Sequence, residues 1–242
     1  EGYPFVERYL RGVLDSGVAI YGKETGELPA DGELDPDIVR KALGLPARPA
    51  MSLPAGSVVP PRRPPQLCQG CPHADSYAFL NEALRDFPVH TVNSDIGCYT
   101  LGAMPPHDAI ESCVDMGASM GMARGAAEAG LTPAVAVIGD STFYHSGLTN
   151  LIDIVSHNSN VKVLILDNST TAMTGAQPTI LPSEKLRRIV AATGVSEEHI
   201  HVLNAHKNDH DKNVATMKAE LAYKGPSVII SARTCLEAAK KA

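Results

Sequence analysis

Two polar residues stand directly after apolar, strand-like runs, and their types suit a divalent cation. Asp140 follows the run 134–138 and one glycine, and Asn168 follows the run 161–166 and one aspartate. The segment between them is long enough for a helix, at about 146–157, and a return strand. This predicts a βαβ unit, whose right-handed crossover leaves both strand ends at one edge of a parallel sheet, where doubly wound folds bind ligands.

Magnesium explains why these residue types are useful there. It prefers hard oxygen ligands in an octahedron and commonly bridges protein carboxylates to phosphate oxygens. We expect a carboxylate oxygen from Asp140, an amide oxygen from Asn168 and a main-chain carbonyl from Thr170, with phosphate oxygens of a ligand and water completing the shell. Backbone amides after Gly139 would help to hold such a phosphate group. The alternative is a pair of ordinary polar turns, but the spacing and the preceding strands favour a metal site.

Four of the five cysteines are expected near the same edge. Cys68 and Cys71 form a Cys-x-x-Cys pair, and Cys98 and Cys235 each follow an expected strand. Four thiolates in one place suit an iron–sulfur cluster. Zinc binding, or simple packing of small apolar thiols, are the alternatives. Cys113 is expected to be a packing residue.

Four segments carry a family resemblance. They are Gly-Asp-Ser-Thr-Phe-Tyr-His-Ser-Gly (139–147), Asp-Asn-Ser-Thr-Thr-Ala-Met-Thr-Gly (167–175), Ser-Asp-Ile-Gly-Cys-Tyr-Thr-Leu-Gly (94–102) and Cys-Gln-Gly-Cys-Pro-His (68–73). Together they resemble the thiamine diphosphate-binding domain of indolepyruvate ferredoxin oxidoreductase alpha subunits, within the 2-oxoacid:ferredoxin oxidoreductase family. The similarity runs from about residue 66 to 235. Gln69 and Ala74 depart from the family pattern, in which Pro and Arg are expected beside the cysteine pair.

The resemblance implies which residues hold the cofactors. It places thiamine diphosphate and Mg²⁺ against Gly139, Asp140, Ser141, Asn168, Thr170, Thr171, Met173, Thr174, Gly97, Cys98, Asp115 and Met116. It assigns one 4Fe-4S cluster to Cys68, Cys71, Cys98 and Cys235. His145, in the first of these segments, and His73, beside the cysteine pair, are candidates for catalysis. The alternative for each histidine is a hydrogen-bonded structural role.

The implied reaction is oxidative decarboxylation of a 2-oxo acid, such as indolepyruvate, to acyl-CoA, with electrons passing through the cluster to ferredoxin. Enzymes of this kind take an activating glutamate from a pyrimidine-binding domain. No such domain fits before residue 66, so we expect it in an absent segment or a partner subunit, within a hetero-oligomer or dimer of heterodimers. Glu111 is the alternative inside this sequence. A non-redox thiamine diphosphate-dependent decarboxylase and a non-catalytic structural subunit are the alternative functions.

Composition agrees with a soluble enzyme domain. The 242 residues are 44% hydrophobic, enough for one α/β core. A net charge of −6, without a long basic run, argues against a nucleic-acid partner, and no apolar stretch approaches the roughly 18 residues of a membrane helix. Free cysteines and the lack of a signal peptide predict a cytoplasmic protein. Because the sequence opens on Glu1, we expect a piece of a longer protein or a processed product.

The elements that must position these residues alternate between strand and helix. Residues 1–45 are expected to be the tail of a preceding domain or a docking segment, 46–65 a Pro-rich linker, and 66–242 the thiamine diphosphate-binding domain. In the last part, strands near 89–93, 134–138, 161–166, 199–203 and 227–231 alternate with helices near 75–85, 117–129, 146–157, 182–193 and 211–223. This predicts an α/β fold with a doubly wound, mostly parallel sheet and helices on both faces.

One expected helix has an unusual face. Gly117, Gly121 and Gly125 recur every four residues along it. Such spacing puts the glycines on one side of a helix, which predicts close packing against another backbone.

Overall fold

The computed structural model describes residues 3–49, 54 and 64–240. The chain divides into two compact units, residues 1–62 and 63–242, which are described separately. Most of the expected linker, 46–65, lies outside the described residues. None of the helices in the described part of the chain has the length and apolar character that a membrane span requires.

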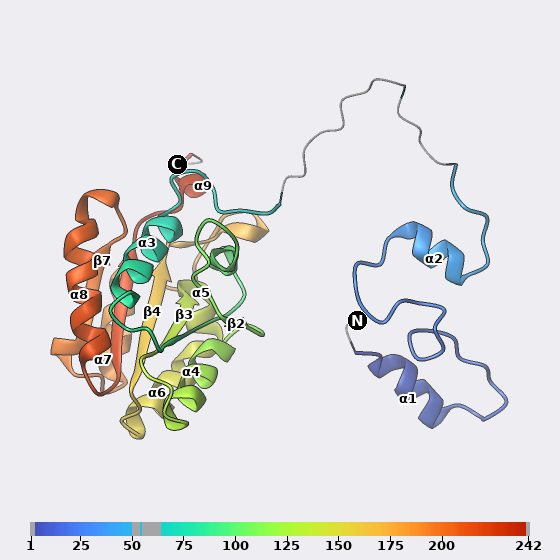
Figure 1. Cartoon of the computed structure of the whole chain (residues 1–242), viewed down its shortest axis with the longest axis horizontal. Helices are drawn as coiled ribbons and strands as arrows, with labels where there is room; N and C mark the ends of the chain where they lie inside the picture. Colours follow the sequence, from blue (N-terminus) through green and yellow to red (C-terminus); the bar gives the residue numbers. More distant parts are fainter. Residues whose placement is uncertain (1–2, 50–53, 55–63, 241–242) are drawn as a thin grey trace. The chain divides into compact units, whose positions relative to one another are not determined.

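The second unit is built on a six-stranded parallel sheet with the strand order β2-β1-β3-β4-β8-β7 (Figure 1). The strands are β1 (Thr91–Ser94), β2 (Ser112–Cys113), β3 (Ala134–Gly139), β4 (Val161–Asp167), β7 (Ile200–Asn204) and β8 (Ser227–Ala232). Five of these lie where the sequence predicted strands, and β2 was not predicted. Its two residues pair with β1, and so short a run has no periodicity of its own.

Helices cover both faces of this sheet. On one face lie α3 (Pro72–Leu84) and α8 (His210–Ala222), and on the other lie α4 (Ala118–Glu128), α6 (Leu148–Ser156) and α7 (Ser183–Ala192). Successive strand residues point to opposite faces, so Val135 and Val137 pack with α3 and α8, whereas Ala136 and Ile138 pack with the other three helices. The doubly wound α/β fold predicted from the sequence is confirmed.

The segment after β3 turns helical at once. The chain passes from α5 (Asp140–Thr142) through a π-helical turn, η2 (Phe143–Gly147), into α6. The expected start near residue 146 was therefore too late. A π turn inside a helix is uncommon and occurs frequently at functional sites.

Several short elements at the ends of strands were not predicted, because each is too short to show a periodic pattern. They are η1 (Cys98–Ala103), β5 (Thr170–Thr171), η3 (Ala172–Thr174), β6 (Gln177–Pro178), η4 (Glu197–His199), η5 (Lys207–Asp209) and α9 (Leu236–Ala239). Three of them, η1, β5 and η3, hold residues that the sequence assigned to the cofactor.

The glycine face of α4 is only partly packed. At Gly117, where φ is +94°, a Cβ would lie 2.3 Å from the Ser146 hydroxyl oxygen. In the described part of the chain, nothing lies within 4 Å of the position that a Cβ would take at Gly121 or Gly125. The predicted close approach is therefore correct at Gly117 and wrong, within these residues, at the other two.

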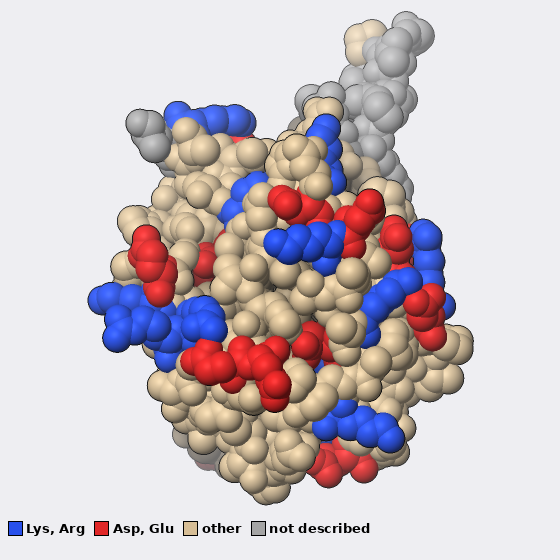
Figure 2. Space-filling view, turned by 90° about the vertical axis from the view of Figure 1, so that its left-hand side faces the viewer, with Lys and Arg blue, Asp and Glu red and all other residues tan. Residues whose placement is uncertain are grey.

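Charged side chains of both signs lie next to one another on the face of the second unit that carries α7 and α8 (Figure 2). Lys218 of α8 pairs with Asp86 at 2.6 Å, and Arg187 of α7 pairs with Glu197. Acidic and basic groups on this face therefore offset one another locally.

The first unit holds two short helices, α1 (Phe5–Val13) and α2 (Pro36–Ala42). Among residues 3–49, Gly22 alone is buried. Most apolar residues of α1 are exposed, including Phe5 and Tyr9, and Leu10 is half-buried. Apolar burial among its described residues therefore contributes little to this unit.

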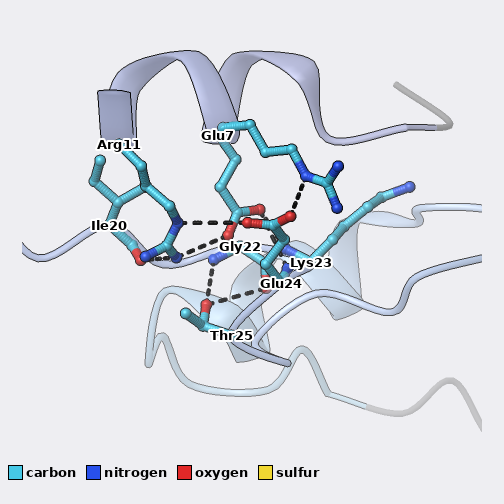
Figure 3. Close-up of polar contacts among 8 residues, drawn as sticks. Glu7, Arg11, Ile20, Gly22, Lys23, Glu24 and Thr25 are labelled. Carbon is cyan, nitrogen blue, oxygen red and sulfur yellow. Dashed lines mark hydrogen bonds and ion pairs between the residues drawn. The ribbon is translucent and has the colours of Figure 1, made fainter. Parts of the chain in front are cut away.

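Polar contacts hold α1 to the segment that follows it (Figure 3). The Glu7 carboxylate accepts from the backbone N–H groups of Lys23 (2.9 Å) and Glu24 (3.3 Å) and from the Arg11 guanidinium (3.0 Å). A Cβ at Gly22 would lie 2.4 Å from this carboxylate. A side chain at this position would therefore have to displace the Glu7 carboxylate.

Candidate functional site

The polar residues predicted to meet do so at the carboxyl edge of the sheet. In the parallel register Gly139 of β3 pairs with Leu166 of β4, and Asp167 pairs with Ala232 of β8. The residues that follow these strands therefore leave the sheet side by side. This is the edge at which open α/β sheets bind ligands.

A cavity of about 330 Å³ lies at this edge, which is large enough for a small ligand. We call it the oxygen cavity, because carboxyl, amide and hydroxyl groups lie along its wall. Its lining includes Gly97, Cys98, Met116, Gly139, Asp140, Ser141, Asn168, Thr170, Thr171, Met173, Thr174 and His73. Most residues assigned to the cofactor from sequence thus share one wall.

Two predicted residues lie elsewhere. Asp115 is exposed, and its main-chain carbonyl accepts from the N–H of Ala118 (3.3 Å) at the start of α4. His145 is exposed on the π turn. Neither lines the oxygen cavity.

Asp140 is a buried carboxylate whose charge has little compensation. Its oxygens accept from the backbone N–H groups of Ser141 (2.7 Å) and Ser169 (2.9 Å). Asp167 lies beside it and accepts from the N–H of Ser169 (3.1 Å) and the hydroxyl of Ser183 (2.8 Å). Burial, and then the Asp167 carboxylate, raise the pKa of Asp140 above its ordinary value. A divalent cation would offset both effects, so the donor set fits Mg²⁺.

Asn168 is held from three directions. Its Oδ1 accepts from the N–H of Thr170 (3.1 Å), and its Nδ2 lies 3.1 Å from Nε2 of His73. Its main-chain carbonyl accepts from the N–H of Cys235 (3.0 Å). The next residue, Ser169, has φ +61°, a left-handed conformation that turns the chain so that Thr170 reaches the same wall.

Tyr99 is a site residue that sequence reasoning missed. Its ring lies so close to two glycines that an added Cβ would come within 2.2 Å at Gly97 and 2.5 Å at Gly139. Its hydroxyl donates to Thr142 Oγ1 (3.1 Å) or to the carbonyl of Ile96 (3.2 Å). The glycines on either side of the cavity are the signal that could have revealed a packed ring between them.

A second, smaller cavity of about 140 Å³ adjoins the first. Its lining includes all four cysteines predicted to converge, Cys68, Cys71, Cys98 and Cys235, so we call it the sulfur cavity. Four residues line both cavities, namely His73, Cys98, Asn168 and Ala172. Cys113 lies outside both, on β2, with its sulfur 3.5 Å from the carbonyl of Asp95.

The thiols surround the sulfur cavity without converging on one point. Among the residues that the structure describes, no three His, Cys, Asp or Glu side chains are grouped closely enough to hold a metal ion. A cluster of several iron atoms is wider than one ion, so its four ligands are spread around it. Burial raises the pKa of Cys71 and of Cys98, so metal loading has to displace protons from these thiols.

His73 is buried at the start of α3, in the wall between the cavities. Burial, and then the nearby Arg233 charge, lower its pKa to about 4. The ring meets Tyr99 edge to face, with centroids 6.0 Å apart. At neutral pH the imidazole is therefore uncharged and can accept a hydrogen bond.

Glu111 is remote from this wall. Its carboxylate accepts from the N–H of Val92 (2.6 Å) and lies 3.7 Å from His90. It lines another cavity, together with Asp108. Among the described residues, no glutamate lines the oxygen cavity.

Comparison with known proteins agrees with this geometry. Residues 95–231 match the family described as thiamine pyrophosphate enzyme, C-terminal TPP binding domain. The chain belongs to this family. Thiamine pyrophosphate is the cofactor called thiamine diphosphate above, and the matched range contains Asp140, Asn168 and most of the oxygen cavity wall.

Curated relatives share more than this domain. The chain is 34% identical to the indolepyruvate oxidoreductase subunit IorA of Methanothermobacter thermautotrophicus, over 96% of this chain and 40% of the relative. It is 35% identical to the subunit of the same name from Archaeoglobus fulgidus, over 96% and 39%. The resemblance to indolepyruvate oxidoreductases indicated by the motifs is confirmed. The chain spans about two fifths of the length of these relatives.

A solved structure shows the same fold. The chain resembles a 2-oxoglutarate:ferredoxin oxidoreductase from Magnetococcus marinus, determined with 2-oxoglutarate, coenzyme A and succinyl-CoA bound. The TM-score is 0.59 and the identity 16%, over 72% of this chain and 66% of that one. The likeness is one of fold.

Proposed function

We propose that this chain is the thiamine diphosphate-binding part of a 2-oxo acid:ferredoxin oxidoreductase. The observation that carries the proposal is the shared wall between the oxygen cavity and the sulfur cavity. An electron donor formed in one cavity would lie beside an acceptor held in the other. Neither cavity alone distinguishes this reaction from one that lacks electron transfer, such as a non-redox decarboxylation.

In the oxygen cavity, Asp140, the amide oxygen of Asn168 and the carbonyl of Thr170 would hold Mg²⁺ against the diphosphate. When bound, thiamine diphosphate supplies the electron sink that decarboxylation of a 2-oxo acid requires. The protein would orient this group, with Met116 and Met173 as apolar parts of the wall. His73 would stay neutral. We assign no role to His145, because it does not line the oxygen cavity.

In the sulfur cavity, Cys68, Cys71, Cys98 and Cys235 would hold one 4Fe-4S cluster. Cys68 is exposed, whereas Cys71 is buried. The cluster would therefore reach from the cofactor wall toward the surface, where ferredoxin could accept electrons.

The remaining assignments rest on the family. The substrate would be an aryl 2-oxo acid such as indolepyruvate, and coenzyme A would take the acyl group. Since no described glutamate lines the oxygen cavity, the activating carboxylate would come from a pyrimidine-binding domain or partner subunit, in a hetero-oligomer such as a dimer of heterodimers. We place the enzyme in the cytoplasm, where thiols stay reduced.

The test is the cofactor and metal content of protein purified without oxygen. We expect iron and acid-labile sulfide, and calorimetric binding of thiamine diphosphate that requires Mg²⁺. Cofactor binding without iron would favour a non-redox decarboxylase, and binding of neither would favour a structural subunit. Zinc in place of iron would overturn the electron-transfer part of the proposal.

A further inference from the structure

His73 and Asn168 meet at the wall that both cavities share, although they are 95 residues apart in the sequence. His73 is the second residue of α3, directly after the turn that presents Cys68 and Cys71. Asn168 follows β4. Both are buried, with exposed fractions of 3% and 6%. Their side-chain nitrogens are 3.1 Å apart, so this contact is a hydrogen bond shielded from water.

The direction of this hydrogen bond follows from its neighbours. A backbone N–H can only donate, so the atom of Asn168 that faces the N–H of Thr170 at 3.1 Å has to be Oδ1. The amide NH₂ then faces His73 and can only donate. His73 Nε2 therefore accepts, which requires a neutral imidazole with its proton on Nδ1.

We infer that His73 is a positioning residue for Asn168, which rests on the proposed function of the oxygen cavity. By accepting from Nδ2, the imidazole prevents the amide from turning over. Oδ1 stays beside Thr170, where its second lone pair can bind the cation. A turned amide would present NH₂ to the cation, which cannot be a ligand. The edge-to-face contact with Tyr99 holds the imidazole ring in turn.

The inference predicts which substitutions at position 73 preserve cofactor binding. His73→Leu fills similar space but cannot accept a hydrogen bond, and loss of a partner behind a metal ligand typically weakens binding by about 10- to 100-fold. His73→Gln restores an acceptor through its side-chain oxygen and should retain most of the affinity. Ser76→Ala is the matched control, because Ser76 is buried one turn further along α3 and contacts Ser231 rather than Asn168.

Calorimetric titration of the full chain with thiamine diphosphate and Mg²⁺ separates positioning from general damage. We expect a loss of about tenfold or more for His73→Leu, little for His73→Gln and none for Ser76→Ala. In the Asn168→Ala background, His73→Leu should have no further effect, because the group that it orients is gone. Equal affinity of wild type and His73→Leu, or additive effects in the double variant, would overturn the inference while leaving the proposed function intact.

A second readout does not depend on cofactor binding. Nitrogen-15 NMR of the cofactor-free protein at neutral pH should show His73 with its proton on Nδ1 and an unprotonated Nε2. A proton on Nε2 would overturn the inference directly. Wild-type protein that binds no cofactor with Mg²⁺ even when the pyrimidine-binding domain or partner subunit is added, yet shows the expected tautomer, would instead contradict the proposed function.

Discussion

Both ends of β4 bury polar groups. At one end the fold supplies partners for the buried charge, and at the other end two carboxylates lie side by side. Near its amino end, the Lys162 ammonium is fully buried and donates to the carbonyl oxygens of Tyr223 (2.8 Å) and Gly225 (2.6 Å), with the Tyr223 ring 4.9 Å away. At its carboxyl end, Asp167 lies beside Asp140, two acceptors of like charge. Among the described residues, neither aspartate forms an ion pair with a lysine or arginine.

The difference separates a structural polar cluster from a ligand site. Buried polar groups whose partners all come from the fold need no ligand to complete their hydrogen bonds. Buried like charges without a counter-ion destabilise the fold, and a bound cation reduces the repulsion between them. We therefore expect substitutions at the two ends to have opposite profiles, with stability lost at Lys162 and ligand binding lost at Asp140.

Asp140→Ala should have the largest effect on binding. Without the carboxylate, Mg²⁺ would face the diphosphate with too few hard ligands, so affinity for thiamine diphosphate should fall by more than about 100-fold. Unfolding in urea should show no loss of stability, because repulsion with Asp167 is removed. Asp211→Ala, on the exposed side of α8, is the control. Wild-type-like affinity in Asp140→Ala would refute the site assignment.

Substitution of the cysteines should lower the iron content and leave the Asp140 site, at the carboxyl end of β4, intact. We expect Cys71→Ala or Cys98→Ala to remove most of the iron and the broad visible absorption, since a cluster takes four thiolates. Cys113→Ala should keep both, because Cys113 lies outside the sulfur cavity. Equal loss of iron in all variants, measured by metal analysis after anaerobic purification, would point to general destabilisation.

Lys162→Ala should destabilise the fold without changing cofactor affinity. It leaves two carbonyl oxygens without a donor and empties buried space, which together cost about 3 kcal/mol in free energy of unfolding. Urea denaturation measures this, and calorimetry of the same variant measures binding. If Lys162→Ala were as stable as the wild type but had lost cofactor binding, the structural role of the amino end of β4 would be contradicted.

The smallest expected effect is a pH dependence at the amino end of β4. Burial lowers the pKa of Lys162 to about 8, against about 10.4 in an unfolded chain. Between these values the unfolded chain binds a proton that the folded chain has released. The free energy of unfolding of the wild type should therefore rise, relative to Lys162→Met, by on the order of 2 kcal/mol from about pH 8 to 10. Parallel stability profiles of the two proteins would contradict the lowered pKa.

Much of the site could be predicted because it depends on strand ends. The apolar runs before Asp140 and Asn168 fix two parallel strands, and the parallel register then places both residues at one edge. The same argument brought Cys98 and Cys235 to the sulfur cavity. A strand can be recognised from the residues within it, so the positions of the strand ends follow from the local sequence.

Contacts between distant segments could not be predicted in this way. Lys162 stands in an apolar run that gives no sign of its partners in Tyr223 and Gly225. His199 and His201 both contact the buried carboxylate of Glu220, at 3.1 and 2.7 Å, and no local pattern in the sequence indicates these contacts. The ring of Tyr99 fills the space beside Gly139 only because β1 and β3 are neighbours. Each of these depends on tertiary packing.

The three-way anchoring of Asn168 also bears on the order in which the protein matures. Its side chain is tied to the segment of Cys71 through His73, and its carbonyl is tied to the N–H of Cys235. Whichever cavity fills first therefore restricts the backbone that forms the other. The second ligand then loses less conformational entropy on binding, which makes the two loading steps mutually favourable. Thiols in cofactor-loaded protein should accordingly react more slowly with air than those in empty protein.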